Sequence, residues 1–575
     1  MENREFARVL AETADLMEIA GEDPFRIRSY RNAASAIESS GERVDELLRT
    51  EGRSVTEIPG VGKGIASAIA EISQRGSFER RDQLLEKYPP TALELLKIQG
   101  LGPKTIAMLW EHYRISTVDD LEKICQEQKL RGLPRLGAKT EEKILKAICG
   151  YRQRAGRILL STADQLATEL CDYLSQTPGV EQVTKAGSVR RGRETAGDID
   201  ILVTGPDPGP ALDRFVHHPR VGEVLVHGGN KASARVGLQN VQVDVRALPR
   251  ESFGAALQYF TGSKDHNVAL RQRALRLGYT LNEYGLFRLE DNARAAGETE
   301  EEIYAKLQMA WIPPELRENQ GEIECAVEGR LPALVEAHQI RGDLHMHTTE
   351  TDGRASLEEM AAAAKALGYE YIAITDHSKA LAMANGLDEV RAIAFAARVR
   401  GLDPEELGIH VLSGIECDIR RDGTMDLEDD ALAALDFVIG SVHSYMNLEP
   451  AEMTDRLLRA LACPHVHALG HLTGRVLMSR DPYPFDFERV ASEAARRNVW
   501  LEINASPERL DLYDTLLRVA KARGCRFVIS TDAHHPKHLL NMRYGVTMAR
   551  RGWLEAGDVG NTRTLAGMKE LKARG

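Results

Sequence analysis

The 575-residue chain lacks paired cysteines, an excess of positive charge and long apolar runs. Its seven cysteines are scattered singly, which argues against a disulfide scaffold or a cysteine zinc site and fits a reducing cytoplasm. No apolar stretch approaches the ~20 residues of a membrane span, and the first residues, MENREFARVLAETADLM, contain no signal-peptide core. We therefore expect a cytoplasmic protein without a membrane partner.

The charge balance limits how the chain could contact a polyanion. The net charge is −12, which argues mildly against nucleic acid as a partner, although a single groove can be basic on an acidic protein. Residues 1–150 carry 23 Lys and Arg against 25 Asp and Glu. Any nucleic-acid contact in this part must therefore come from local geometry and not from bulk charge.

The patterning along the chain predicts several domains, as the length also does at roughly 100–200 residues per domain. Residues 1–150 read as helices broken by glycine turns, and residues 157–290 mix helices with strands. A polar, helix-prone stretch over 314–340 reads as a linker. From residue 341 short apolar strands alternate with helical stretches, which predicts a parallel sheet or barrel.

Three segments in the first part repeat one plan, namely IPGVGKGIASAI (58–69), IQGLGPKTIAML (98–109) and LPRLGAKTEEKI (133–144). The first two resemble helix-hairpin-helix motifs, in which glycines let the backbone approach a DNA phosphate and the next helix points free N–H groups at it. The alternative is ordinary helix–turn–helix packing, and the third copy, which has lost a glycine, could be structural only. The candidate DNA contacts are Gly60, Gly62, Gly64, Gly100, Gly102 and Lys104.

A buried-strand pattern in the middle part contains charged residues. In AGDIDILV, Asp198 and Asp200 are two residues apart and so point to one face of a strand. A second strand pattern, NVQVDVRAL, offers Asp244. Two like charges on one face repel, but a hard cation such as Mg²⁺ between them makes the arrangement favourable. The preceding GSVRRGRETAGD supplies glycines, Ser188 and Arg191 for phosphate, and together these features describe a two-metal phosphoryl-transfer site.

These motifs, followed by YFTGS and LNEYGLF, resemble the family-X DNA polymerases over about residues 1–317. The resemblance implies a helical DNA-binding domain, then fingers, an α+β nucleotidyltransferase palm and a thumb. Asp198, Asp200 and Asp244 would be catalytic and would hold two Mg²⁺ ions. The domains expected along the whole chain are 1–85 (helical, first hairpin), 86–150 (fingers, second hairpin), 151–250 (palm), 251–317 (thumb), 318–340 (linker) and 341–575 (a metal-dependent phosphoesterase).

The same resemblance implies nucleotide contacts. The triphosphate, sugar and base-pair contacts would come from Arg157, Gly187, Ser188, Arg191, Tyr259, Phe260, Gly262, Asn267 and Arg271. One departure concerns the lysine that some members use as a Schiff-base nucleophile in 5′-deoxyribose phosphate lyase chemistry. Ala68 stands at the matching position and Lys63 lies in the hairpin, which argues against lyase activity.

Histidines dominate the last part. GDLHMHTTETDG places two imidazoles on one side of a strand end, and later strand ends bring TDH, GIECD, GSVHS, LGHLTGR and STDAHH. A lone H-x-H is weak evidence and could be a solvated loop. Ligand-type residues at successive strand ends are typical of a barrel active site. Mixed imidazole and carboxylate ligands favour Zn²⁺, Mn²⁺ or Fe.

This part resembles the PHP (polymerase and histidinol phosphatase) domain over about residues 341–575, which implies a distorted (β/α)₇ barrel with up to three metal ions, Mn²⁺ or Zn²⁺. The implied ligands are His345, His347, Asp352, His377, Glu416, His443, His471, Asp532 and His534. HLTGR departs from the commoner His-Pro of its motif but keeps the ligand, and Arg475 is a candidate contact for a substrate phosphate. His465, His467 and His535 match no position of the motif set.

Together the two resemblances imply a repair polymerase that binds gapped or nicked DNA and dNTPs and fills short gaps, of the base-excision-repair type. Its C-terminal domain would act as a 3′–5′ exonuclease and could also cut at abasic sites or remove 3′-phosphates. Two alternatives remain at this point, a phosphoesterase whose polymerase half only binds DNA and a non-catalytic DNA-end scaffold. Primer extension on gapped DNA separates the three functions, because only the repair polymerase would extend a primer and only the scaffold would show no turnover. The sequence gives no protein partner and no oligomeric state.

Overall fold

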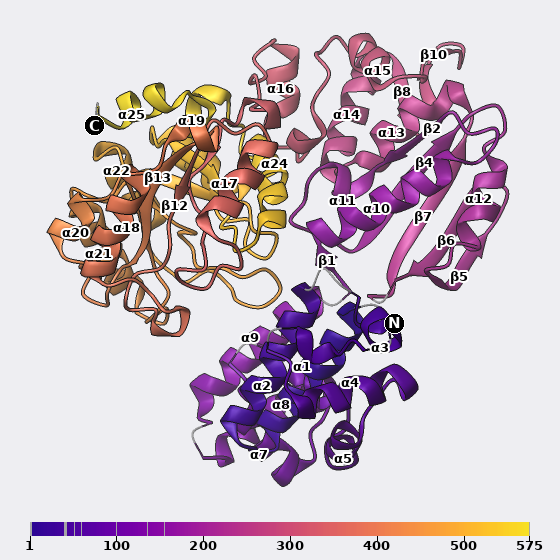
Figure 1. The fold of residues 1–575 in the computed structure, drawn as a ribbon. Helices are drawn as coiled ribbons and strands as arrows, with labels where there is room; N and C mark the ends of the chain where they lie inside the picture. The colour runs from indigo at the N-terminus through magenta and orange to yellow at the C-terminus, as the bar shows by residue number, and fades with distance from the viewer. Residues whose placement is uncertain are drawn as a thin grey trace. The chain divides into compact units, whose positions relative to one another are not determined.

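The computed structural model describes residues 3–39, 43–50, 52–58, 60–98, 100–134, 136–154, 156–237 and 239–573. Two compact units, Met1–Ala155 and Gly156–Gly575, follow one another along the chain, and each is described by itself (Figure 1). Pro59, Gln99 and Arg135, one in each repeated segment, lie outside the described residues. No helix within the described ranges is long and apolar enough to cross a bilayer.

The first unit is all helical. Apolar residues at helical spacing, such as Phe6, Leu10 and Met17 on the first helix, form one buried core. The helices are α1 (Asn3–Ile19), α2 (Pro24–Ser39), α3 (Val44–Arg49), α4 (Lys63–Arg75), α5 (Glu79–Lys87), α6 (Ala92–Leu95), α7 (Pro103–Tyr113), α8 (Val118–Gln126) and α9 (Ala138–Arg154). The predicted helical N-terminal part is therefore confirmed.

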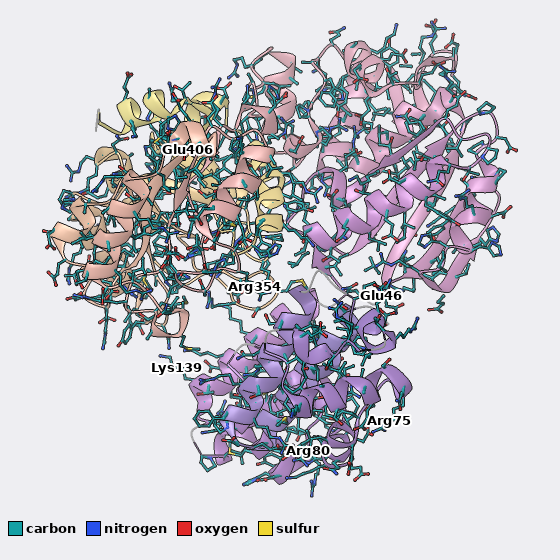
Figure 2. The ribbon with its side chains drawn as sticks, viewed as in Figure 1. Glu46, Arg75, Arg80, Lys139, Arg354 and Glu406 are labelled. Carbon is teal, nitrogen blue, oxygen red and sulfur yellow. The ribbon has the colours of Figure 1, made fainter. Side chains whose placement is uncertain are left out.

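Most basic side chains around α4 and α5 are already neutralised. Arg75 lies 2.9 Å from Glu71 and also pairs with Asp82, while Arg80 pairs with Glu22 (Figure 2). These ion pairs are at or near the surface, so each contributes little stability. They do reduce the cationic side chains that this unit has left for a phosphate backbone.

The second unit begins with a five-stranded mixed sheet in the order β2-β4-β7-β6-β5. Its interior strand β4, between β2 and β7, buries Ile199, Ile201, Leu202 and Val203, which explains the apolar run around the two aspartates. The elements are β1 (Ile158–Leu159), α10 (Leu160–Ser175), β2 (Gln182–Lys185), α11 (Gly187–Arg190), β3 (Thr195–Ala196), β4 (Asp198–Thr204), α12 (Gly209–Val216), β5 (Val221–His227), β6 (Lys231–Val236) and β7 (Val241–Leu248).

A smaller subdomain follows the sheet. Two helices lead into a three-stranded antiparallel sheet in the order β10-β9-β8. The elements are α13 (Phe253–Thr261), α14 (Lys264–Arg276), β8 (Tyr279–Asn282), β9 (Gly285–Arg288), β10 (Arg294–Ala296) and α15 (Glu300–Lys306). The expected linker is ordered: it forms α16 (Glu322–Val327), which buries Ile323 and Ala326 against this subdomain.

The C-terminal part is a parallel barrel. Its seven strands follow in chain order, each parallel to the next, and Met346 bridges to Ala533 beyond the first and last strands, which nearly closes the barrel. The predicted seven-stranded fold is confirmed. The strands are β11 (Gly342–Asp343), β12 (Tyr371–Ile374), β13 (His410–Asp418), β14 (Phe437–Ser441), β15 (Ala468–Leu469), β16 (Trp500–Asn504) and β17 (Phe527–Ser530).

Helices surround these strands (Figure 1). Their apolar residues pack on the outer face of the barrel, as Val490 and Leu517 do, so the strand ends are left for polar side chains. The helices are α17 (Leu357–Ala366), α18 (Glu389–Arg400), α19 (Pro404–Leu407), α20 (Asp429–Ala433), α21 (Pro450–Ala462), α22 (Phe487–Arg496), α23 (Asp514–Ala522), α24 (Met542–Arg551) and α25 (Leu565–Ala573).

Candidate active sites

Two neighbouring parallel strands carry the three candidate catalytic carboxylates. Strands β4 and β7 pair so that Asp200 lies opposite Asp244 and Asp198 opposite Gln242. Asp198 and Asp200 share one face of β4 because side chains alternate along a strand. The register thus brings together the three residues that the sequence had placed on two separate segments.

These carboxylates repel one another. Burial and the neighbouring carboxylates of Asp198 and Asp244 raise the pKa of Asp200 to about 7. Burial would also raise the pKa of Asp244, but the contacts from Lys231 and Gln242 outweigh it and lower this pKa. A divalent cation would relieve the repulsion at Asp200, and an all-oxygen donor set fits Mg²⁺.

Lys231 is a part of this site that the sequence did not reveal. Its Nζ lies 2.7 Å from Asp244 Oδ2, across the antiparallel pair β6 and β7. Gln242 Nε2 donates to the other carboxylate oxygen at 3.2 Å. The only hint in the sequence is that β6, KASARV, begins with a lysine followed by small residues. These two donors hold Asp244 in one orientation and keep it charged.

A glycine-led turn forms one side of the site. Gly187 begins α11 with a φ of 61°, and a Cβ at this position would clash with Asp200 Oδ2. The Ser188 hydroxyl is buried and has no hydrogen-bond partner among the described residues. A buried hydroxyl without a partner is costly, so Ser188 fits a role in binding a ligand oxygen.

The two arginines expected at the triphosphate have protein partners. Arg191 Nε donates to Glu318 at 3.1 Å, and Nη1 donates to the Thr261 carbonyl. Arg157 Nε donates to the Thr195 hydroxyl at 2.8 Å. Arg191 must therefore release Glu318, at least in part, before it can pair with a phosphate.

The residues expected at the sugar and base lie around the turn between α13 and α14. The rings of Tyr259 and Phe260 meet edge to face at 5.1 Å, and Gly262 has a φ of 67°. Asn267 is largely buried and donates to the Tyr259 carbonyl at 2.7 Å, which holds the turn together. Arg271 lies exposed one turn further along α14.

A buried ion-pair cluster supports this turn and was not foreseen. Both carboxylate oxygens of Glu300 accept hydrogen bonds from Arg190 and from Arg317, at distances between 2.6 and 3.0 Å. Trp311 Nε1 donates to the same carboxylate at 3.0 Å. Burial disfavours the charged form of Glu300, but Arg317 and Arg190 outweigh it and keep its pKa well below the usual range.

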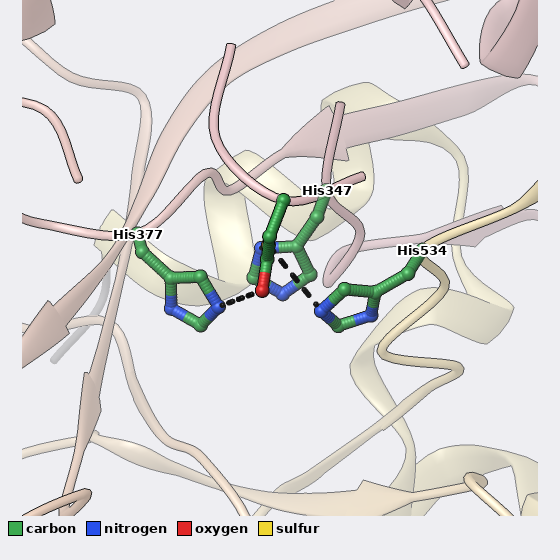
Figure 3. A group of neighbouring side chains, drawn as sticks. His347, His377 and His534 are labelled. Atoms are coloured by element: carbon green, nitrogen blue, oxygen red, sulfur yellow. Dashed lines mark ion pairs between the residues drawn. The ribbon is translucent and has the colours of Figure 1, made fainter. Parts of the chain in front are cut away.

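In the barrel, eight of the nine predicted ligands gather into three groups. Within each group the possible ligand atoms lie within 4.8 Å of one another. His347 and His377 each belong to two of these groups, so the groups are contiguous. Figure 3 shows these two histidines with His534. The ninth residue, His471, lies 2.8 Å from Glu416. The groups are His347, Asp352, His377 and His534; His345, His347 and Asp532; and His377, Glu416 and His443.

The electrostatics of these groups fit bound cations. Burial and the neighbouring His534 and His377 lower the pKa of His347 to about 3, so its ring is neutral and able to ligate. Burial disfavours the charged form of His377, but Glu416 and Asp352 raise its pKa to about 10. His345 Nε2 and His347 Nδ1 are buried without a hydrogen-bond partner among the described residues. Imidazole nitrogens and surplus carboxylates suit transition metals.

Carboxylates behind the ligands were missed because each lies within an apolar strand pattern. Glu502 accepts a hydrogen bond from His345 Nδ1 at 2.6 Å and from the His471 backbone N–H at 2.7 Å. Asp418 lies 3.3 Å from His443 Nδ1. Such partners fix the tautomer and direction of a ligand imidazole.

The candidate phosphate contact in the barrel needs revision. Arg475 donates to the backbone carbonyl of Arg509. Its guanidinium also lies 2.8 Å from the carboxylate of Glu194, so its charge is already neutralised by a protein group. Arg509 lies closer to the metal groups, with its Nε 3.8 Å from Asp532 Oδ2 and its side chain 22 % exposed. Arg509 is therefore the better-placed cation for a substrate phosphate.

The three repeated segments of the first unit share one backbone hydrogen bond. Gly60 and Gly100 have φ values of 92° and 91°, and the next N–H donates to Ile58 and Ile98 respectively. The third copy makes the matching bond, from Leu136 to the Leu133 carbonyl at 3.2 Å. Arg135, which stands where the first two copies have Gly60 and Gly100, lies outside the described residues.

The helices after the first two hairpins begin with uncapped backbone N–H groups. Gly62 and Gly102 are the N-cap residues of α4 and α7, and neither provides a side-chain cap. A cleft of about 720 Å³ beside the first hairpin is lined by Arg26, Tyr30 and the hairpin glycines. Lys63 and Lys104 are exposed and have no ion-pair partner within the described ranges. This surface suits a phosphate.

Known proteins resemble the chain in each of these parts. Residues 1–78 match a helix-hairpin-helix domain, 92–148 a SAM-like helix-hairpin-helix tandem, 256–318 a DNA polymerase beta thumb and 343–506 a PHP domain. A Bacillus subtilis protein named DNA polymerase/3′-5′ exonuclease PolX is 36 % identical over 575 residues, which is 100 % of both chains. DNA polymerase lambda of Rattus norvegicus is 28 % identical over 46 % of each chain. That of Arabidopsis thaliana is 26 % identical over 55 % of this chain and 62 % of the relative.

Proposed function

Because the chain belongs to the family-X DNA polymerases that carry a C-terminal PHP domain, we propose that it fills short gaps in DNA repair and trims 3′ ends in one polypeptide. One observation carries the proposal. The three carboxylates of β4 and β7 and the histidine groups of the barrel are two sets of candidate metal ligands that share no residue. Two independent sites on one chain are what a polymerase with its own nuclease requires.

For nucleotide addition, Asp198, Asp200 and Asp244 would hold two Mg²⁺ ions. When bound, these ions would stabilise the charge that develops on the triphosphate and on the primer hydroxyl. Lys231 and Gln242 keep Asp244 oriented, and the unpartnered Ser188 hydroxyl is available to a phosphate oxygen. Arg191, Arg157, Tyr259, Phe260, Gly262, Asn267 and Arg271 would form the rest of the dNTP site.

For hydrolysis, the nine barrel residues would hold up to three ions, Mn²⁺ or Zn²⁺. When bound, these ions would supply a nucleophilic water at neutral pH and neutralise the phosphodiester. Glu502 and Asp418 orient the ligand imidazoles, and Arg509 is placed to contact a non-bridging phosphate oxygen. The substrate would be a DNA 3′ end. Cleavage at abasic sites or removal of a 3′-phosphate would use the same geometry.

For binding, the hairpins would contact the phosphates of gapped or nicked DNA in the cytoplasm. Contacts to phosphate carry no sequence information, so affinity should fall with salt and be almost independent of base sequence. The lyase reaction is not part of this proposal, because Ala68 is buried on α4 where a lysine nucleophile would be needed.

The test uses two variants and one gapped duplex. The double variant Asp198→Asn, Asp200→Asn should lose nucleotide addition and keep digestion of 3′ ends, and His345→Ala should do the reverse. Circular-dichroism melts establish that each variant is folded. If a folded Asp198→Asn, Asp200→Asn protein extended primers, or a folded His345→Ala protein trimmed 3′ ends at the wild-type rate, the corresponding assignment would be wrong. Digestion without any extension by the wild type would favour the phosphoesterase alternative.

A further inference from the structure

A cleft on the barrel lies beside the metal groups and has no role in the function proposed above. Its volume is about 610 Å³, which is within the usual range of small-molecule sites. Asp418, on one wall, lies 3.3 Å from the ligand His443, and Ser444 and Tyr445 on the other wall follow His443 directly in the chain. The cleft therefore borders the group His377, Glu416 and His443.

One buried arginine holds both walls of this cleft. Arg456 is 1 % exposed, and its Nη1 donates to the Ser444 and Tyr445 carbonyls at 2.9 and 3.3 Å. Its Nε donates to the Arg420 carbonyl at 2.9 Å, and Nη2 donates to that of Ile419. Burying a guanidinium is costly unless its donors are satisfied. Here the donors bond to backbone carbonyls of the two loops, which gives the cleft a fixed shape.

The surface of the cleft is aromatic and cationic. Tyr445 is 58 % exposed and has a φ of 52°, a left-handed conformation that is unfavourable for an L-residue. The Arg421 guanidinium lies 5.7 Å from the centre of its ring. Large exposed aromatic side chains in strained backbone often mark functional sites. An exposed ring beside an arginine is also the usual platform for an unpaired base and its phosphate.

The carboxylates of Asp422 and Asp426, around the cleft, already accept hydrogen bonds from protein groups. Asp426 accepts hydrogen bonds from the Ala380 backbone and from Arg420, and Asp422 accepts two from Thr424. No carboxylate of the described residues lies within ion-pair distance of the Arg421 guanidinium. The positive charge of Arg421 is thus available to an anionic ligand.

We infer that this cleft binds the terminal nucleotide of an unpaired 3′ end, with its base stacked on Tyr445 and a backbone phosphate beside Arg421. The inference rests on the proposed nuclease function, which it extends from the phosphodiester to the base. A base must leave the helix to stack on Tyr445, and unpairing is least unfavourable for a mismatched end. The barrel should therefore trim frayed or mismatched ends faster than paired ones.

The test compares two single-stranded hexanucleotides that differ only in their 3′-terminal residue, which is either an ordinary nucleotide or an abasic tetrahydrofuran. Because stacking of one base on an aromatic ring changes affinity about tenfold or more, the wild type should digest the ordinary end about tenfold faster in kcat/KM. Tyr445→Asn tolerates the left-handed backbone but removes the ring, and it should lower the rate on the ordinary end to that on the abasic end. Tyr445→Phe keeps the ring and should resemble the wild type.

Two results would overturn the inference. Tyr445→Asn could lose the same factor on both ends, which would mean a general effect on the barrel, or it could keep the full preference for the base. A binding measurement separates these results from failure of the nuclease itself. Fluorescence anisotropy with phosphorothioate-linked versions of both oligonucleotides should show tighter binding of the base-bearing end by the wild type and no difference for Tyr445→Asn. Base-dependent binding without digestion would refute only the nuclease function, and equal binding of both ends by the wild type would refute the cleft.

Discussion

Glu502 lies in the middle of β16, and its two carboxylate oxygens have different partners. One accepts the hydrogen bond of the His345 imidazole at 2.6 Å, and the other accepts that of the His471 backbone at 2.7 Å. Its side chain is fully buried and does not belong to any of the three metal groups. Glu502 therefore acts through the two histidines and holds them toward the centre of the barrel.

Replacing Glu502 by Gln should weaken the nuclease and leave gap filling unchanged. An amide is a poorer acceptor, and loss of such a supporting carboxylate costs about 10–100-fold in metal affinity or activity. The measurement is 3′-end digestion across a Mn²⁺ titration, whose midpoint should shift to higher concentration. Glu488→Gln, on an exposed position of α22, is the matched control. An unchanged midpoint in Glu502→Gln would argue that His345 is held by other contacts.

At the scale of single elements, the junction between β2 and α11 shows why a glycine, Gly187, begins the turn beside the three aspartates. Gly187 combines a positive φ with a backbone that lies directly against Asp200. Any side chain there would be strained and would displace the carboxylate. The element is four residues long, so its position depends on this contact and not on helix propensity.

Gly187→Ala should therefore abolish nucleotide addition, by at least about a hundredfold, since small misplacements of reacting groups have effects of this size. Digestion of 3′ ends should not change, because the barrel groups share no residue with this turn. Gly229→Ala, in the β5–β6 loop with no atom near its Cβ, is the control and should be fully active. Both activities are measured on the same preparation, and a fully active Gly187→Ala enzyme would contradict the described contact.

The hairpins allow a second prediction at this scale. Gly102, the N-cap of α7, has a φ of −93° and open space around its Cβ, so alanine fits there without a clash or backbone strain. The added methyl would stand between the α7 N–H groups and a DNA phosphate. We expect Gly102→Ala to lower the affinity for gapped DNA about fivefold, as loss of one phosphate contact in a salt-dependent interface would.

The control for Gly102→Ala is Gly132→Ala, which is equally open but lies outside the three hairpins. Anisotropy titrations over a salt series give both the affinity and its salt slope, and thermal melts establish that stability is unchanged. Equal affinities for the two variants would mean that the second hairpin does not touch DNA.

At the scale of the whole molecule, the barrel contacts the turn that follows α11 in the part of the chain with the five-stranded sheet. Arg551, on α24, is almost fully buried, donates to the Arg191 carbonyl at 2.8 Å and to Glu318 at 3.1 Å, and pairs with Asp514. Glu318 is thus shared between Arg551 of the barrel and Arg191 of the nucleotide site. The barrel helps to determine how strongly Arg191 is held.

Removing Arg551 should raise the KM for dNTP and change kcat less. Without Arg551, Glu318 would pair with Arg191 more strongly, and the triphosphate would have to compete for it. We expect Arg551→Met to raise this KM about fivefold and to lower the melting temperature, since breaking a buried ion pair costs about 3–5 kcal/mol. Arg551→Lys keeps the charge and should recover part of the KM effect, whereas Arg489→Met, an exposed position, should have none. A wild-type KM in a folded Arg551→Met protein would show that the two parts work independently.

The sequence by itself determined the elements and most of the chemistry. Period-2 alternation in AGDIDILV and period-3.6 patterns in the first unit depend only on local backbone geometry, so the strand with two aspartates and the helical hairpins could be predicted. The alternation of short apolar strands with helices predicted a parallel sheet or barrel, and the resemblance to the PHP domain implied its seven strands. The candidate ligands lay at strand ends, where parallel strands bring them together.

Only the tertiary structure decided which residues support these sites. Lys231, Glu300 and Glu502 lie within ordinary strand or helix patterns, and their roles depend on partners 13 to 157 residues away. Whether a cation is free or already paired depends on packing between segments, which is why Arg475 and Arg191 have protein partners where the sequence suggested phosphates. Local patterns record the face on which a side chain lies, but the energy of a buried charge depends on every group folded against it.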